Sequence, residues 1–400
     1  MRVLVTSSIY PTPRSPKVVG GAELFVRQLT GSLVKNGDEV EVIRAATARS
    51  NQEKETADGI DVYSAPIRNI YLPFTEHRSA PLRGLWHMVE DWQQTAQLVA
   101  ERIKAFKPDI LHSNNLSGLT TAVWKTASEL HIPVLHTLHD YYLTCPRCSR
   151  FSSGHACNHT CMSCKILSVN RRKATSYLDG VVGVSQRILD IHTELGLFAE
   201  TRVRKVIRHA SALAPIAPSS PRMDGPLTLG FIGRLTEEKG IFNLVTALAS
   251  LPPDAVRLVI AGRASAEVQT KLRGLAPNAN IDFLGFVPPE QFYRQIDIVV
   301  IPPIWEEPGP IVVADAQAAH KPFLGTRFGG IPEAVAGGAV GWLTASDPAS
   351  LANSIEKILS NPDEIAAMVL KLSTRTKKRE FSDVASEYRE TFEHLAGQHK

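Results

Sequence analysis

The stretch Trp305-Glu-Glu-Pro-Gly-Pro-Ile-Val-Val-Ala-Asp315 decides the fold. Before it runs Asp297-Ile-Val-Val-Ile-Pro-Pro303, an apolar segment typical of a buried parallel strand. After it comes an alanine-rich segment that favours a helix and ends at Pro322. Glu306 and Glu307 are therefore expected in the loop at the carboxyl end of a strand. The unpaired amides that open the following helix suit a phosphate group, because the helix dipole also favours negative charge there.

The composition is that of an ordinary soluble protein long enough for two domains. The chain has 400 residues, of which 44% are hydrophobic and 21% are charged. A net charge of +4 does not point to nucleic acid, and it suits anionic nucleotides as well as the inner face of a membrane. No apolar run approaches the ~20 residues of a membrane span. The opening Met1-Arg-Val-Leu-Val-Thr6 has a strand pattern without a signal peptide, so a cytoplasmic location is expected.

The first half opens with a strand–turn–helix pattern. Arg2 to Ser7 is the expected first strand, and Gly20-Gly21 lies in the turn before a helix. The helix is expected to bury an apolar face that contains Leu24, Phe25, Leu29, Leu33 and Val34. A glycine pair lets backbone approach a ligand closely, although simple turn chemistry is the alternative. The pair is not a Gly-x-Gly-x-x-Gly fingerprint, which disfavours a nicotinamide enzyme.

Two further predicted strands of the first half end in polar residues. They are Pro108 to Ser113 and Pro133 to Asp140, and the second ends with His139 and Asp140. Open α/β sheets bind ligands at the carboxyl ends of their strands. His139 is therefore a candidate site residue, and a histidine that hydrogen-bonds within its loop is the alternative.

All five cysteines lie in one short stretch with the spacing C-x2-C-x8-C-x3-C-x2-C. They are Cys145, Cys148, Cys157, Cys161 and Cys164. Two C-x2-C pairs in a cytoplasmic protein favour tetrahedral thiolate coordination over disulfides. We therefore predict a structural zinc ion that uses four of these thiolates, with an iron–sulfur cluster as the weaker metal alternative. Free or redox-active thiols remain open.

The second half repeats the α/β pattern after a segment rich in Pro, Ala and Ser. A new strand begins at Leu227, and Gly233-Arg-Leu-Thr-Glu-Glu-Lys-Gly240 follows it. Arg234 and Lys239 thus stand between two glycines at the start of a helix. A merely solvated basic pair at a helix start would not explain the flanking glycines.

These motifs, in this order, resemble the retaining glycosyltransferases of the GT-B fold, glycosyltransferase family 4 (group 1). Trp305 to Asp315 is similar to their Glu-x7-Glu motif, and Thr137-Leu-His-Asp-Tyr141 is similar to their Thr-x-His-Asp-Tyr motif. Gly233 to Gly240 resembles their Gly-Arg-Leu-x3-Lys-Gly motif. The cysteine stretch resembles an insertion that a subset of the family carries after the His-Asp-Tyr motif.

The resemblance implies an α/β protein with the GT-B fold, in which two Rossmann-like, doubly wound parallel-sheet domains face a central cleft. The expected parts are an N-terminal acceptor domain with a Cys-rich insertion, a linker, a C-terminal donor-binding domain and a last helix that returns to the first domain. Their expected bounds are 1–212, with the insertion at 145–164, then 213–226, 227–378 and 379–400.

The resemblance also implies roles for individual residues. His139 and Glu307 would be catalytic, and Asp315 would bind the donor ribose, although the family has Glu there and Asp is one methylene shorter. Arg234 and Lys239 would clamp the diphosphate and cancel the charge that grows on the leaving group. The other donor-binding residues would be Gly20, Gly21, Gly309, Pro310 and Ile311.

The implied reaction is transfer of a hexose from a UDP- or GDP-sugar, with retained configuration and no catalytic cofactor. The acceptor would be a glycan, a lipid-linked saccharide or a polysaccharide precursor. The aromatic and basic stretch from Pro73 to Trp92 would shape the acceptor site or touch the membrane peripherally, or else pack on the sheet as helices. A non-catalytic partner subunit with a degenerate donor site, a nucleotide-sugar epimerase and a phosphorylase with a pyridoxal cofactor are the alternatives.

Overall fold

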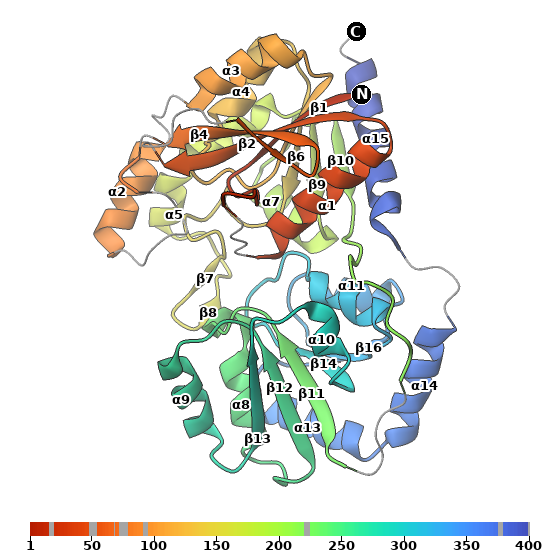
Figure 1. Ribbon diagram of the computed structural model, residues 1–400. Helices are drawn as coiled ribbons and strands as arrows, with labels where there is room; N and C mark the ends of the chain where they lie inside the picture. Colours follow the sequence, from red (N-terminus) through yellow and green to blue (C-terminus); the bar gives the residue numbers. More distant parts are fainter. Residues whose placement is uncertain are drawn as a thin grey trace. The chain divides into compact units, whose positions relative to one another are not determined.

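The computed structural model describes residues 1–15, 20–47, 54–67, 69–71, 79–90, 95–219, 225–374 and 379–398. Of the aromatic and basic stretch from Pro73 to Trp92, residues 73–78 and 91–92 lie outside these residues, as do linker residues 220–224. The chain divides into two compact units (Figure 1). Unit 1 comprises Met1–Arg150, Asn158–His209 and Phe381–Lys400, and unit 2 comprises Phe151–Cys157 and Ala210–Glu380. Within the described ranges, no helix is both long and apolar enough to cross a bilayer.

Unit 1 is built on an eight-stranded sheet. Its strands are β1 (Arg2–Ser7), β2 (Glu39–Thr47), β3 (Lys54–Ala57), β4 (Ile60–Ile67), β5 (Ile110–Ser113), β6 (Val134–Leu138), β9 (Gly180–Gly183) and β10 (Val203–Val206). They lie in the order β10-β9-β6-β5-β1-β2-β4-β3, and all neighbours are parallel except β3 and β4. The strand order reverses between β1 and β5, which is the switch point where open α/β sheets bind ligands.

The helices of unit 1 connect these strands. They are α1 (Gly21–Lys35), α2 (Ala80–Glu90), α3 (Thr95–Phe106), α4 (Ala122–Glu129), α5 (Met162–Leu167), α6 (Val169–Ala174), the 3-10 helix η1 (Thr175–Tyr177), α7 (Gln186–Glu194) and α15 (Phe381–Gly397). The last of them, α15, is distant in sequence but packs against α1. Its Tyr388 hydroxyl hydrogen-bonds Thr137 Oγ1 at 3.1 Å, and its Phe392 is fully buried.

Unit 2 is built on a six-stranded sheet in which all strands are parallel. The strands are β11 (Leu227–Ile232), β12 (Val256–Ala261), β13 (Asn280–Gly285), β14 (Ile298–Ile301), β15 (Phe323–Thr326) and β16 (Gly341–Thr344). Their order, β13-β12-β11-β14-β15-β16, is the Rossmann order, with its switch point between β11 and β14. A two-stranded hairpin of β7 (Phe151–Ser152) and β8 (His155–Ala156) also belongs to this unit.

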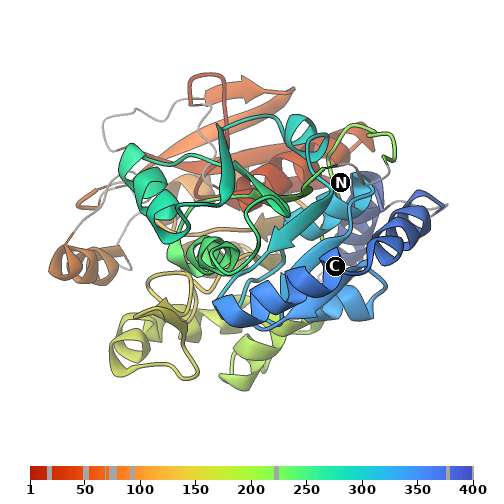
Figure 2. The same cartoon turned by 90° about the horizontal axis from the view of Figure 1, so that it is seen from below.

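Helices cover both faces of the unit 2 sheet (Figures 1 and 2). They are η2 (Glu237–Lys239), α8 (Ile241–Leu248), α9 (Ala266–Leu275), α10 (Pro289–Tyr293), α11 (Ile311–Ala318), α12 (Ile331–Ala336), α13 (Pro348–Leu359) and α14 (Pro362–Ser373). Leu258 and Ile260 of β12 join a core with α8, α9 and α13, while the alternate residues Val259 and Ala261 join a core with α10, α11 and α12. Strands buried on both faces explain the continuous apolar runs in the sequence. The predicted α/β fold class, with two doubly wound parallel sheets, is confirmed.

Candidate active site

Two loops of unit 2 meet at the switch point of its sheet. The loop after β11 carries Arg234 and Lys239, and the loop after β14 carries Glu306 and Glu307. The amide of Ile304 in the second loop donates to the Glu238 carbonyl in the first at 3.0 Å. Adjacent parallel strands thus bring together motifs that lie almost 70 residues apart in the sequence.

Glu307 is the centre of a small polar cluster in these loops. Its side-chain oxygen Oε2 accepts from Lys239 Nζ at 2.6 Å and from Trp305 Nε1 at 2.9 Å. The ammonium of Lys239 also lies 5.2 Å from the centre of the Trp305 ring. Trp305 and Glu307 are both buried, so the carboxylate is fixed in direction and its charge is neutralised by a partner that reaches solvent. Arg234 is not part of this cluster, because its exposed guanidinium lies 3.6 Å from Glu238.

Two glycines allow three loops of unit 2 to pack closely. Gly240 follows the loop after β11, Gly329 lies in the loop after β15, and both contact the loop after β14. Gly240 has a φ of +72°, and a Cβ atom there would collide with the carbonyl oxygen of Pro302. Gly329 has a φ of +59°, and a Cβ atom there would collide with the Glu307 backbone. The Gly329 amide donates to Glu306 at 3.0 Å, and the Gly330 amide donates to the Glu307 carbonyl at 2.9 Å. Only residues without a side chain permit this packing.

Helix α11 begins directly after the Pro308-Gly309-Pro310 turn. No side chain caps its first turn, and its first two residues, Ile311 and Val312, are half-buried. The Val313 amide donates to the Pro310 carbonyl at 3.0 Å, so the amides of Ile311 and Val312 are the ones available to an anion. Asp315 lies further along α11, and its carboxyl group accepts a hydrogen bond from Ser211 Oγ at 2.6 Å. Burial raises the pKa of Asp315 to about 7. Asp315, which the sequence predicted to bind the donor ribose, thus already has a protein partner on one of its carboxyl oxygens.

In unit 1, His139 follows β6 and faces residues from the neighbouring strand and helix. Its Nε2 hydrogen-bonds Asn114 Oδ1 at 3.0 Å. Its ring lies 5.2 Å from that of Phe25 in α1 and stacks on His209 with a centroid distance of 6.1 Å. Burial, and then the neighbouring His209, lower the pKa of His139 well below 6.5. The imidazole is therefore neutral at pH 7.

Asp140 braces the turn after His139. Its Oδ1 accepts from the Tyr142 amide at 2.8 Å, and its Oδ2 accepts from Asn115 Nδ2 at 3.3 Å. Burial raises the pKa of Asp140 to about 6. Among the described residues, Asn114 Nδ2 and Asn115 Oδ1 are buried and have no hydrogen-bond partner. These two amides directly follow β5 at the unit 1 switch point, and sequence reasoning had missed them.

The Gly20-Gly21 pair lies where the sequence placed it, at the start of α1. The Gly20 amide donates to Glu23 Oε2 at 2.6 Å, and Glu23 is buried. Gly20 is in extended backbone with a φ of −159°, so its conformation does not require glycine. The first turn of α1 is thus capped by its own glutamate.

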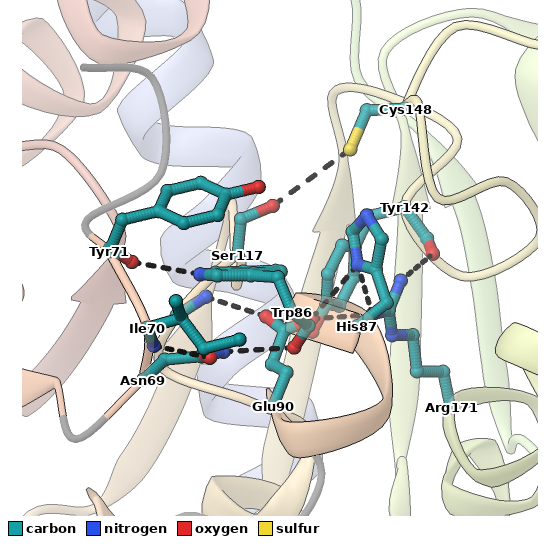
Figure 3. Close-up of polar contacts among 11 residues, drawn as sticks. Asn69, Ile70, Tyr71, Trp86, His87, Glu90, Ser117, Tyr142, Cys148 and Arg171 are labelled. Carbon is teal, nitrogen blue, oxygen red and sulfur yellow. Dashed lines mark hydrogen bonds and ion pairs between the residues drawn. The ribbon is translucent and has the colours of Figure 1, made fainter. Parts of the chain in front are cut away.

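A buried ion pair lies close to the His139 loop, and the sequence did not predict it. Arg171 of α6 pairs with Glu90 of α2, and neither side chain is exposed (Figure 3). The other Glu90 oxygen accepts from the Gly118 amide at 2.6 Å and from the Tyr142 hydroxyl at 2.9 Å. Arg171 also stacks on the Tyr142 ring at 4.0 Å. The first arginine of α6 is therefore an interior residue.

The structure does not bring the five cysteines together. The Cys148 thiol lies 3.9 Å from Ser117 Oγ (Figure 3), whereas the Cys161 thiol lies 3.2 Å from Ser163 Oγ. Cys157 belongs to the hairpin segment of unit 2. Within the described part of the chain, no group of three or more His, Cys, Asp or Glu side chains is arranged to hold a metal ion. These described residues therefore give the predicted zinc site no support.

The comparisons with known proteins agree with this arrangement of motifs. The sequence matches the family described as Glycosyltransferase Family 4 over residues 19–206 and the family described as Glycosyl transferases group 1 over residues 216–379. An uncharacterized 42.6 kDa protein in the cps region of Klebsiella pneumoniae is 33% identical over 339 residues, which cover 83% of this chain and 87% of that protein. The glycogen synthase of Mycobacterium tuberculosis is 26% identical over 383 residues, which cover 90% and 87%.

Solved structures of glycosyltransferases share the fold. Sucrose-phosphate synthase from Thermosynechococcus elongatus superposes with a TM-score of 0.71 at 17% identity, covering 99% of both chains. Anabaena HepE, in a complex with UDP and glucose, superposes with a TM-score of 0.69 at 20% identity, covering 98% of this chain and 99% of that one. Together with the family matches, these neighbours define the two-unit architecture as GT-B. The chain therefore belongs to the group 1, family 4 glycosyltransferases and is a glycosyltransferase of the GT-B fold.

Proposed function

We propose that this glycosyltransferase moves a hexose from a UDP- or GDP-sugar to a glycan, lipid-linked saccharide or polysaccharide precursor, with retention of anomeric configuration. The observation that carries the proposal is the cluster of Lys239, Trp305 and Glu307 at the unit 2 switch point. Anabaena HepE, which has the same fold, binds UDP and UDP-glucose, which supports a nucleotide sugar as the donor. The relative from the cps region supports a role in polysaccharide synthesis.

In this proposal unit 2 binds the donor, and the diphosphate lies against the N-terminus of α11. Lys239 and Arg234 neutralise the charge that develops on the departing diphosphate, and Gly309, Pro310 and Ile311 line it. Glu307 holds the hydroxyl groups of the transferred sugar. Its partner Lys239 must then divide its hydrogen bonds between the carboxylate and a phosphate oxygen, which a rotatable ammonium with three donors can do.

In the same proposal unit 1 binds the acceptor, and His139 is its catalytic residue. A neutral imidazole can exchange hydrogen bonds with sugar hydroxyls without adding charge. The unpaired amide atoms of Asn114 and Asn115 are further candidates for such contacts. Gly20 and Gly21 approach the donor phosphate with their backbone. None of these groups is a carboxylate placed to form a covalent intermediate, so front-face return through an ion-pair-like state is the proposed route to retention.

A donor panel tests the proposal. UDP- and GDP-sugars are screened by thermal shift and by slow hydrolysis with wild type, Glu307→Ala and the control Glu267→Ala, which changes an exposed glutamate on α9. One donor should raise the melting temperature and be hydrolysed by wild type and control alike. Glu307→Ala should lose roughly 10²–10³ in rate, as removal of a preorganised site group typically does. The anomeric configuration of the product, read by NMR, tests retention.

A second candidate is a partner subunit with a degenerate donor site. The hydrogen bond between Ser211 and Asp315 favours it, because it occupies an oxygen that would bind the ribose. If Asp315→Ala leaves donor affinity unchanged, or if no donor gives any response in the panel, this candidate gains and the transferase proposal fails. An epimerised nucleotide sugar that forms from the donor without any acceptor, in place of free sugar and nucleotide, would instead point to an epimerase.

Cytoplasmic location with peripheral contact to the membrane is the last part of the proposal. Leu85 and Met88 of α2 are 50% and 63% exposed, and Met162 and Ile166 of α5 are also exposed. Helices α2 and α5 contact one another, and the exposed Lys165 stands among these apolar side chains. Wild type should sediment with anionic vesicles and the double variant Leu85→Ser, Met88→Ser should not, while exposed Ser386→Ala on α15 should behave as wild type. Equal sedimentation of all three would refute the contact.

A further inference from the structure

Tyr142 is buried, and each of its polar groups is held by another residue of unit 1 (Figure 3). Its hydroxyl donates to Glu90 Oε1 at 2.9 Å, and its carbonyl oxygen accepts from Arg171 Nη1 at 3.2 Å. Its amide donates to Asp140 Oδ1 at 2.8 Å. The guanidinium of Arg171 also lies 4.0 Å from the centre of its ring. A residue held at its ring, its hydroxyl and its backbone fixes the course of the chain next to it.

The two residues that hold the Tyr142 side chain are themselves fixed. Glu90 Oε1 also accepts from the Gly118 amide at 2.6 Å, and Glu90 Oε2 accepts from Arg171 Nη2. The same Nη2 lies 3.0 Å from His87 Nδ1, which accepts because a guanidinium only donates. Neither the Glu90 nor the Arg171 side chain is exposed, so neither can move away without leaving an unpaired charge in the interior.

The turn that carries His139 lies between this ion pair and the loop after β5. Tyr142 closely follows His139 in the chain, and Asp140 between them accepts from the Tyr142 amide and from Asn115 Nδ2. The His139 ring is hydrogen-bonded to Asn114 at 3.0 Å. The direction of the imidazole therefore depends on two supports, one from the asparagines and one from Tyr142.

We propose that Glu90 and Arg171 are positioning residues for glycosyl transfer, which hold Tyr142 and through it fix the orientation of His139. His139 is the proposed catalytic residue of unit 1, so the inference rests on the proposed function. Misplacement of a reacting group by about 1 Å can cost roughly 10²-fold in rate, even when the change lies far from the chemistry. An arginine suits this task because its planar fork directs several hydrogen bonds at once, which an ammonium group cannot do.

The variant Tyr142→Phe separates positioning from folding. It removes one hydroxyl group and leaves the ring on Arg171 and the backbone hydrogen bonds in place. Hydrolysis is measured with the UDP- or GDP-sugar that the donor panel selects. The kcat should fall roughly tenfold while the KM for the donor stays unchanged, because the proposed donor contacts belong to unit 2.

Two further variants complete this comparison. Arg171→Lys keeps a cation beside Glu90 but loses the fork, so it should lower kcat by more than Tyr142→Phe does, again without a change in KM. The matched control is Tyr177→Phe, which removes the hydroxyl of a half-buried tyrosine on η1 and should keep the wild-type kcat.

A double-mutant cycle with His139→Ala shows whether the effect passes through His139. Tyr142→Phe should change the kcat of the His139→Ala variant by less than about twofold, because no imidazole is left to orient. A purely structural role would lower kcat by the same factor in both backgrounds, and that result would overturn the proposal. Wild-type kcat in the Tyr142→Phe variant would overturn it as well.

The cycle also separates failure of this proposal from failure of the proposed function. Wild-type kcat in His139→Ala would remove the catalytic role of His139 and the positioning role together. A large loss in His139→Ala with an additive loss in Tyr142→Phe would remove the positioning role alone. The imidazole nitrogen resonances of His139, assigned by comparison with His139→Ala, give a readout without turnover. Tyr142→Phe should shift them and Tyr177→Phe should not, and unshifted resonances in both would overturn the proposal.

Discussion

The carboxylate of Glu307 has two donors from its own unit, and its position depends on the backbone around it. Trp305 Nε1 and Lys239 Nζ converge on the same oxygen, while the Gly330 amide binds the Glu307 carbonyl. A side chain fixed from several sides loses little further conformational entropy when it binds a ligand. At the scale of single residues, the site therefore depends as much on glycines and an indole as on its charged groups.

Gly240→Ala should damage the donor unit more than a typical glycine substitution. The added Cβ would meet the Pro302 carbonyl oxygen, and the φ of +72° is unfavourable for alanine. The free energy of unfolding should fall by roughly 1–3 kcal/mol or more, the usual range for strain at such a position. Chemical denaturation measures it.

The control is Gly274→Ala on α9. An added Cβ there meets no atom within 4 Å, and the residue lies inside a helix of the same unit. Alanine should stabilise the helix by roughly 0.5–1 kcal/mol because it loses less backbone entropy on folding. If Gly240→Ala and Gly274→Ala change stability in the same direction, Gly240 does not lie against the Pro302 carbonyl as described.

At the scale of elements, the ion pair between Glu90 and Arg171 joins two helices to the loop after β6. Glu90 belongs to the last turn of α2, Arg171 belongs to α6, and Tyr142 contacts both side chains. Arg171→Met should cost roughly 3–5 kcal/mol of unfolding free energy, because it leaves Glu90 buried without its cation. Equilibrium denaturation in urea measures this loss.

The double variant Glu90→Leu, Arg171→Met separates loss of the pair from loss of packing. Replacing a buried pair with apolar residues of similar volume is often neutral, so the double variant should be more stable than Arg171→Met alone. A single variant within about 1 kcal/mol of wild type would show that the charges are not paired in the interior.

Helix α1 shows how far an apolar pattern predicts the buried face of an element. Its inner face contains Phe25, Leu29 and Leu33 as expected, but it continues through Val26 and Thr30, while Leu24 is 46% exposed. Leu24 lies about 100° from Phe25 around the helix, and Val26 lies about as far on the other side. The spacing of apolar residues predicts which side of a helix is apolar. The neighbouring elements decide which residues at the border of that side are buried.

At the scale of the whole molecule, acid should weaken unit 1 before unit 2. Burial lowers the pKa of His112 and His136 to about 3 and that of His192 to about 4. Below pH ~6.5 the unfolded chain takes up protons at these residues and the folded chain does not, so the unfolding free energy falls as the pH drops. Burial also lowers the pKa of His139. Asp140, whose pKa is raised to about 6, and Glu41, whose pKa burial also raises, act in the opposite direction, but they are two groups against four histidines.

Unit 2 should respond in the opposite sense between pH 7 and 4. The raised pKa of Asp315, about 7, means that the folded state holds a proton which the unfolded state has released, so acid favours folding there. Hydrogen exchange resolved by peptides, compared at pH 7.5 and pH 5 after correction for intrinsic rates, should show lost protection in unit 1 first. Earlier loss of protection in the strands of unit 2 would contradict this assignment.

Much of this protein is determined by local sequence. Continuous apolar runs predict parallel strands buried on two faces, and β1 and β11 begin and end close to where those runs do. Glycines, prolines and acidic residues after the runs predict the loops that carry Lys239 and Glu307. These signals are local, because strand burial, turn conformation and helix starts depend on residues a few positions apart.

Only the tertiary structure decided which of these residues meet. Parallel pairing of β11 with β14 brings Lys239 to Glu307, although no local pattern links them. The same holds for the partners Glu90 and Arg171, and for cysteines that share a spacing but point to different neighbours. Spacing along the chain specifies direction only within one helix or strand. Once a chain folds back on itself, contacts depend on sheet order and packing, and these are properties of the whole fold.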